Sequence, residues 1–126
     1  MSEHIELTAP LDGDFGAVVR LIVGGISARV DLGFEEMDDL QLAIERLHAE
    51  AGGQERLTLD FDLSPGRVRV RLGPLLERGL ADALQRGPVA GALTLKGVLD
   101  TLVDSYGVEE AADGRLFIRI VKLVNA

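Results

Sequence analysis

The chain has 126 residues, a formal net charge of −8 at pH 7 and a pI near 4.7. This length is typical of one domain, so we expect a single domain over residues 1–126. The acidic balance argues against a nucleic-acid binder, which normally presents a basic face, and against an anionic membrane surface as the partner. Because the chain has no cysteine, disulfides, thiolate metal sites and cysteine nucleophiles are excluded.

The first residues, MSEHIELTAP, have neither a basic start nor a long apolar run. No window of the sequence reaches the length that a membrane span needs. A chain without cysteine also suits a reducing compartment. These features predict a cytoplasmic protein that does not associate with membranes.

The first predicted element is a short strand in HIELTAP, where apolar residues alternate until Pro10 ends the ladder. A helix is expected from Asp14 to Asp31, because apolar residues then recur at spacings of three and four. We interpret Gly24 and Gly25 as a place where this helix packs closely on a neighbour, since no strand directly precedes them as in a phosphate loop. The expected buried stripe is Phe15, Val18, Val19, Ile22, Ile26 and Val30.

A second helix is expected over roughly Glu35 to Ala51, with Gly52 and Gly53 following it as a C-cap would. His48 lies near the polar edge of this helix and is expected to be a surface residue. Because the other histidine is far away in the sequence, the spacing indicates no cluster of metal ligands, and we predict no metal site. The buried positions are expected to be Met37, Leu40, Ile44, Leu47 and Ala51.

The segment RLTLDFDLSPGRVRVRLG alternates between apolar and polar residues on both sides of SPGR, which predicts a hairpin with PG at the centre of a type II turn. This register sets Asp62 opposite Arg69 and Asp60 opposite Arg71, so each of these arginines faces a carboxylate on the neighbouring strand. The apolar face is expected to lie under the helices. It consists of Leu57, Leu59, Phe61, Leu63, Val68, Val70 and Leu72.

Residues 74–90 predict a short helix or two, broken by Gly79 and ended by Gly87 and Pro88. A third apolar stripe follows in GALTLKGVLDTLVDSYG, and the tail holds two strands joined by a turn at Asp113 and Gly114. We interpret Glu109 and Glu110 as a solvated patch. The expected stripe is Leu95, Val98, Leu99, Leu102 and Val103.

The predicted order is strand, helix, helix, strand, strand, helix, helix, strand, strand. Paired strands separated by paired helices favour an α+β two-layer sandwich, in which helices cover one face of a mostly antiparallel sheet. With this order, VVRLIVGGISARVDLGFEEMDDLQLAIERL and LTLKGVLDTLVDSYGVEEAADGRLFIRIVKLV make the chain resemble the anti-sigma-factor serine kinases of bacterial partner-switching systems. That family belongs to the GHKL, or Bergerat-fold, ATPase superfamily, so the resemblance implies a histidine-kinase-like ATPase fold over nearly the whole chain.

In that family the second helix carries a glutamate and, four residues later, an asparagine that binds the magnesium ion of ATP. Lined up on LAIERLHAEA, those positions hold Arg46 and Glu50. An arginine cannot accept a proton, and a glutamate adds negative charge beside phosphates. A frame shifted by one residue places Glu45 in the base position but Ala49 in the metal position, so neither frame restores a working pair.

The family's adenine box, D-x-G-x-G, corresponds here to Arg71, Gly73 and Leu75, of which only the glycine survives. An arginine has no acceptor for the adenine amino group. In the glycine-rich phosphate turn Gly91 matches, whereas Thr94 replaces a glycine that permits close approach to phosphate.

The resemblance with these departures implies a non-catalytic, ATPase-like regulatory protein that binds a sigma factor, a STAS-type anti-anti-sigma protein or another signalling protein, as a homodimer. The predicted remnant of the cofactor pocket is Glu50, Arg71, Gly73, Gly91 and Thr94, with Arg46 in a degenerate base position and no catalytic residue. Two alternatives stay open. One is an active ATP- and magnesium-dependent serine kinase with rearranged ligands, and the other is a structural or assembly protein that reuses the fold.

Overall fold

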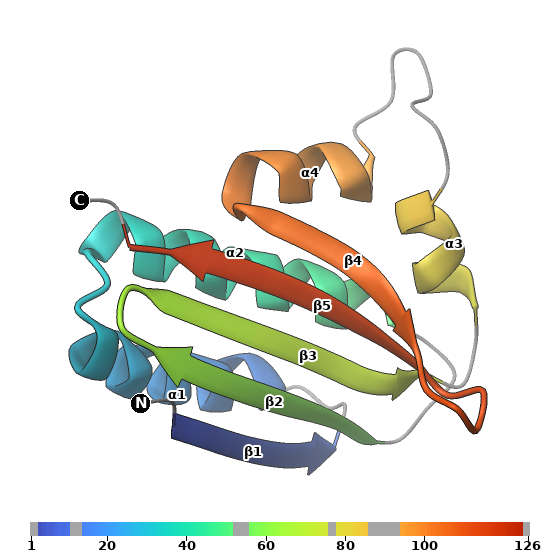
Figure 1. The fold of residues 1–126 in the computed structure, drawn as a ribbon, viewed down its shortest axis with the longest axis horizontal. Coiled ribbons are helices and arrows are strands. Elements are labelled where there is room, and N and C mark those ends of the chain that lie inside the picture. The colour runs from blue at the N-terminus through green and yellow to red at the C-terminus, as the bar shows by residue number, and fades with distance from the viewer. Residues whose placement is uncertain (1–2, 11–13, 52–55, 76–77, 86–93, 125–126) are drawn as a thin grey trace.

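A computed structural model describes residues 3–10, 14–51, 56–75, 78–85 and 94–124 of the chain. Its five strands form one sheet in the order β1-β2-β3-β5-β4, and every neighbouring pair is antiparallel (Figure 1). The order of elements confirms the prediction. The elements are β1 (Glu3–Pro10), α1 (Phe15–Val30), α2 (Phe34–Glu50), β2 (Arg56–Ser64), β3 (Arg67–Leu75), α3 (Gly79–Gln85), α4 (Leu95–Leu102), β4 (Ser105–Glu110) and β5 (Leu116–Leu123).

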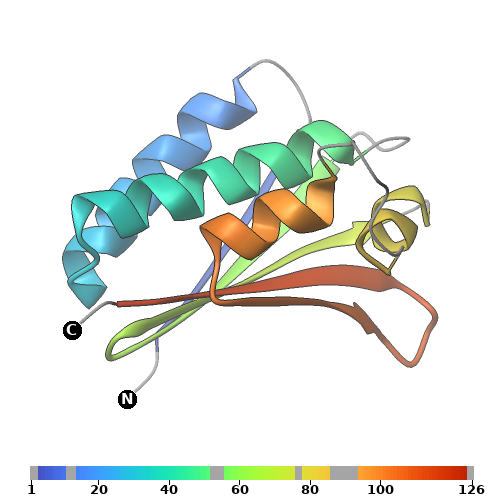
Figure 2. The same cartoon turned by 90° about the horizontal axis from the view of Figure 1, so that it is seen from above.

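The helices lie on one face of the sheet, and the described elements leave its other face open (Figure 2). This arrangement is the predicted α+β two-layer sandwich, and it is consistent with a GHKL-like ATPase fold. Within the described residues, no helix combines the length and the apolar character that crossing a membrane requires.

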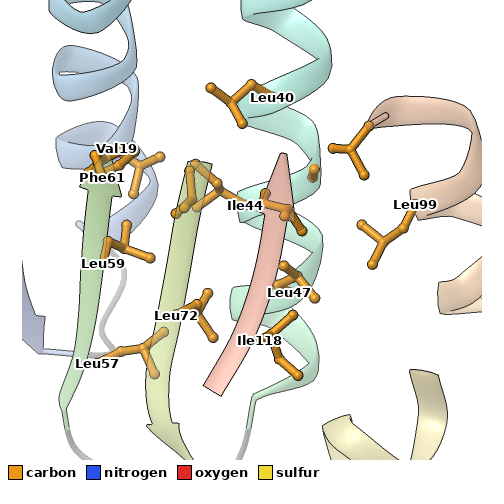
Figure 3. Close-up of a cluster of buried hydrophobic side chains, with 14 of the residues drawn as sticks. Val19, Leu40, Ile44, Leu47, Leu57, Leu59, Phe61, Leu72, Leu99 and Ile118 are labelled. Carbon is orange, nitrogen blue, oxygen red and sulfur yellow. The ribbon is translucent and has the colours of Figure 1, made fainter. Parts of the chain in front are cut away.

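The core lies between the helices and the apolar face of the central strands (Figure 3). Burying a large aliphatic or aromatic side chain stabilises a fold by roughly 1.5–3 kcal/mol, so this layer supplies most of the driving force for folding. Its fully buried side chains include Val19, Leu40, Ile44, Leu47, Leu57, Leu59, Phe61, Leu72, Leu99 and Ile118.

The central hairpin confirms the predicted register. In the strand register, Asp62 lies opposite Arg69 and Asp60 opposite Arg71, and all seven predicted apolar residues of the hairpin are buried. Gly66 has φ of 74°, the positive value that a type II turn requires at its third position. Gly114, in the turn between β4 and β5, also has a positive φ of 86°.

The prediction that the glycine pair of α1 packs closely on a neighbouring element is wrong within this chain. The helix runs through Gly24 and Gly25 without a break, and a Cβ added to either would meet no atom within 4 Å. Val23 is buried in this helix, whereas Val18 and Ile22 are only partly buried. The helix therefore faces the sheet along a line slightly rotated from the predicted stripe.

The predicted boundaries around residues 74–90 also change. Strand β3 continues to Leu75, and Gly79 begins α3 instead of breaking a helix. In α2, Ala43 is buried, whereas Met37 and Ala51 are only partly buried against the core. The predicted stops at Gly52, Gly53, Gly87 and Pro88 lie outside the described residues.

Candidate functional site

A groove of about 560 Å³ runs between α2 and α4. Because neighbours on a helix surface are three or four residues apart, Glu45, Arg46 and Ala49 present one wall of it from α2. Gly97, which lacks a side chain, and Thr101 belong to the facing wall of α4. The remaining lining residues, Leu42, Val98 and Leu102, make the groove mostly apolar.

Three of the four positions that the resemblance aligns with the family's base and metal ligand line this groove, namely Glu45, Arg46 and Ala49, whereas Glu50 does not. Arg46 Nη2 lies 3.5 Å from Glu50 Oε1, one turn later on α2. Glu45 accepts a hydrogen bond of 3.2 Å from Arg20 Nε of α1. The Nε atom of Arg46 is buried and has no hydrogen-bond partner within the described part of the chain. Each charged group at these positions is therefore paired with a neighbouring side chain of the same protein.

Thr94 lies at the start of α4, where its hydroxyl accepts a 3.0 Å hydrogen bond from the backbone N–H of Gly97. This contact is an N-cap, which satisfies one of the amides that a helix leaves free at its beginning. Thr94, which the resemblance aligns with a glycine of the family, thus has a structural role. Gly91 lies outside the described residues.

The sheet separates Arg71 from this groove. Arg71 Nε donates a 2.7 Å hydrogen bond to Glu109, and the guanidinium lies 4.5 Å from the centre of the Phe117 ring, on the open face. Glu109 also accepts a 3.3 Å hydrogen bond from Arg119. Two expectations are corrected here. Arg71 lies opposite Asp60 in the strand register but forms its ion pair with Glu109. Glu109 bridges two arginines and is therefore not part of a solvated patch.

Gly73 has a packing role of its own. A Cβ at this position would lie 2.7 Å from Phe117 Cδ1 and 2.8 Å from the carbonyl oxygen of Leu116. Leu75, two residues later, is buried in the core. The structure thus places Glu50 at the helical layer, Arg71 on the open face and Gly73 against β5, and these three residues do not form one pocket.

Both histidines make specific contacts. His48 is partly buried and stacks on Phe15 with ring centroids 4.1 Å apart, so the expectation of a simple surface residue is wrong. His4 lies on the open face, where its Nε2 forms a short contact with Asp60. This hydrogen bond, followed by the charge of Asp60, raises the pKa of His4 above its usual value.

Sequence reasoning missed the facing wall of the groove, because it did not single out Gly97 and Thr101. It also placed Val98 in one stripe with Leu95 and Leu99, whereas Val98 is only partly buried and lines the groove. It also missed the contact between His4 and Asp60, because these residues are far apart in the sequence and come together only when β1 pairs with β2.

Comparison with known proteins identifies a distant relative. Serine-protein kinase RsbW of Halalkalibacterium halodurans is 26% identical over an alignment of 126 residues, which covers 86% of this chain and 76% of the relative. No protein-family model matches the chain. The similarity to this kinase, together with the α+β fold, supports the resemblance to the anti-sigma type of serine kinase.

Proposed function

We propose that this chain is a non-catalytic, ATPase-like regulatory protein that acts by binding other proteins in a bacterial partner-switching system. The observation that carries the proposal is the ion pair on α2 between Arg46, which lines the groove between α2 and α4, and Glu50. These residues stand where the family has its base and its magnesium ligand.

The chemistry of this pair opposes nucleotide turnover. A guanidinium stays protonated at all physiological pH values, so Arg46 cannot act as a general base. Its charge is directed to Glu50, and that carboxylate is therefore less available to a magnesium ion. In addition, Arg71 lies on the far side of the sheet, where it cannot contact a ligand in the groove.

The groove supports protein binding as the alternative use of this region. Its apolar walls and its rim of Glu45 and Arg46 match the mixed character of a surface that receives an amphipathic segment. Leu42, at its edge, is 44% exposed. We propose a sigma factor or a STAS-type anti-anti-sigma protein as the partner.

We further propose a homodimer through the outer face of α1. Leu21 is 78% exposed, and Gly24 and Gly25 leave space for a close approach of another backbone. Val19 and Ile26 are buried in the protein's own core, so the proposed contact uses the outer side of α1 around Leu21 and not these two residues. A specific interface of this kind buries on the order of 1,200–2,000 Å² in total.

Light scattering at tens of micromolar tests the dimer. We expect the wild type to have twice the monomer mass and Leu21→Asp to have the monomer mass, because a buried charge opposes the interface. Glu110→Lys, an exposed change on β4, is the matched control and should leave the dimer intact. A monomeric wild type would remove the homodimer and leave only a different partner.

An active kinase is the second candidate. The similarity to a protein named as a serine-protein kinase favours it, and so does Glu45, a carboxylate that lines the groove. Under this alternative, Glu45 is the base and the magnesium ligands are rearranged.

Calorimetry with Mg-ATP separates the two candidates. The proposal predicts no binding at millimolar Mg-ATP and no rise in melting temperature. A ligand at a hundred times its Kd would stabilise the protein by roughly 2.7 kcal/mol, which a thermal scan detects easily. Micromolar affinity that disappears on chelating magnesium would overturn the non-catalytic proposal. Loss of that affinity in Glu45→Gln would then identify the base.

A further inference from the structure

A cluster of three potential metal ligands lies on the open face of the sheet, at the edge formed by β1. His4, Glu6 and Asp60 each offer one ligand atom, and these atoms all lie within 4.8 Å of one another. The strand register explains the cluster. Glu6 of β1 pairs directly with Asp60 of β2, and His4 is two residues before Glu6 on the same face of its strand.

The charges around this cluster point to a cation. Like charges directly opposite each other on neighbouring strands are destabilising, and here two carboxylates occupy such a pair. Among the described residues, no arginine or lysine forms an ion pair with Glu6 or Asp60. The nearby arginines of the open face are directed elsewhere, with Arg69 bound to Asp62 and Arg71 to Glu109. Within the part of the chain that the structure describes, His4 is the one basic group that forms an ion pair with either carboxylate.

We propose that His4, Glu6 and Asp60 bind a divalent transition-metal ion, and that Zn²⁺ fits them best. Zinc binds both imidazole nitrogen and carboxylate oxygen, whereas magnesium and calcium prefer sites made of oxygen alone. Three protein ligands leave a fourth position for water in a tetrahedral shell. The ion cancels the repulsion between Glu6 and Asp60 and ties the edge strand to β2.

This site is independent of the proposed function, because it lies on the face of the sheet opposite the groove. All three side chains are accessible, since His4 and Glu6 are exposed and Asp60 is partly buried. The ligands come from two strands held in one antiparallel ladder, so their spacing is set before the ion arrives.

The test is calorimetric titration of the full chain, without an affinity tag, with Zn²⁺ at neutral pH. We expect one ion per chain, a higher melting temperature with zinc, and no comparable binding of Mg²⁺. His4→Gln and Glu6→Gln should each weaken zinc binding more than about tenfold, which is the lower end of what the supporting shell of a metal site contributes. Glu110→Gln, an exposed acidic change distant from the cluster, should bind zinc as the wild type does.

Cobalt as a substitute ion gives a second readout that does not depend on stability. A tetrahedral site with an imidazole ligand should give Co²⁺ visible absorption bands that are absent in His4→Gln. The proposal is overturned if zinc does not bind at millimolar concentration. It is also overturned if His4→Gln and Glu6→Gln, both folded by circular dichroism, bind zinc as tightly as the wild type.

Discussion

The two faces of one sheet use the same strands in opposite ways. On the helical face, Phe61 and Val70 are no more than 1% exposed and belong to the hydrophobic core. On the open face, their immediate neighbours Asp62 and Arg69 form an ion pair that is more than one-third exposed on each side. The alternation of side chains along a strand therefore divides the molecule into a face that stabilises it and a face that is available for recognition.

The two faces also differ in how much their contacts contribute to stability. Apolar burial contributes kilocalories per side chain, whereas an exposed ion pair contributes about 0–1 kcal/mol. The open face nevertheless carries ordered contacts, such as Glu109 bridging Arg71 and Arg119. Such contacts set the positions of charges while adding little to stability.

The largest effect is expected from Phe61→Ala on the helical face. Phe61 is fully buried, so its truncation removes apolar burial and leaves a cavity. We expect a loss of about 3–5 kcal/mol in the free energy of unfolding. Urea denaturation monitored by circular dichroism measures it, and a loss below about 1 kcal/mol would contradict the assigned core.

Gly73→Ala is expected to have the next largest effect and shows that the open face also contains tight packing. The new methyl group meets the carbonyl oxygen of Leu116, which cannot move aside cheaply. We expect a loss of about 1–3 kcal/mol by the same denaturation experiment.

Gly24→Ala is the matched control for that change. It adds the same methyl group in open space within a helix, and should stabilise the monomer by about 0.5–1 kcal/mol. If both variants changed stability in the same direction, the assigned packing around these glycines would be wrong.

Asp62→Asn is the counterpart of the first prediction, one residue along the same strand. Removing this partner of Arg69 should cost less than about 1 kcal/mol, because solvent screens both side chains. The difference from wild type should shrink further as salt is added. A cost as large as that of Phe61→Ala would mean that the open face is covered in solution.

The last prediction leaves stability near neutral pH unchanged, because it concerns the ionisation of Tyr106 of β4, which reaches Asp100 of α4. Burial, together with a 2.6 Å hydrogen bond to Asp100, raises the pKa of Tyr106 to about 12. Because the folded state favours the neutral phenol, the stabilisation is fully present below pH 10 and is lost as the pH rises toward 12.

The tyrosine prediction has a direct optical test, since the chain contains one tyrosine and no tryptophan. Phenolate absorbance should titrate with a midpoint near 12, while circular dichroism reports whether the fold persists. Asp100→Asn should lower this midpoint toward the ordinary value, and Asp38→Asn should leave it unchanged. An ordinary midpoint in the folded wild type would show that the contact with Asp100 does not form.

The element order, the hairpin register and the apolar faces could be predicted because each depends on local periodicity. The strict alternation around Pro65 and Gly66, for example, determines which side chains of β2 and β3 are buried. Contacts between distant segments could not be predicted in this way. Arg71 finds Glu109 only because β5 places β4 near β3, and the packing of Gly24 depends on which side of α1 faces the sheet.

The candidate site was less predictable than the fold. Matching positions to a family pattern identified Arg46 and Glu50, and both lie at or beside the groove of α2 and α4. The same procedure assigned Arg71 to the pocket, although the alternation with Val70 already indicated the open face. A motif match on a strand needs the correct alternation as well as the correct spacing, because one residue moves a side chain across the sheet.

The strand order also has a consequence for how the chain folds. Strands β2 and β3 are joined by a two-residue turn and form the centre of the sheet, so their pairing requires only local contacts. In contrast, β4 is hydrogen-bonded to the sheet only through β5, which follows it in the chain. The hairpin can therefore form early in folding, whereas β4 joins the sheet only when β5 has paired with β3, and any opening of β5 exposes the amides of both strands to exchange with solvent.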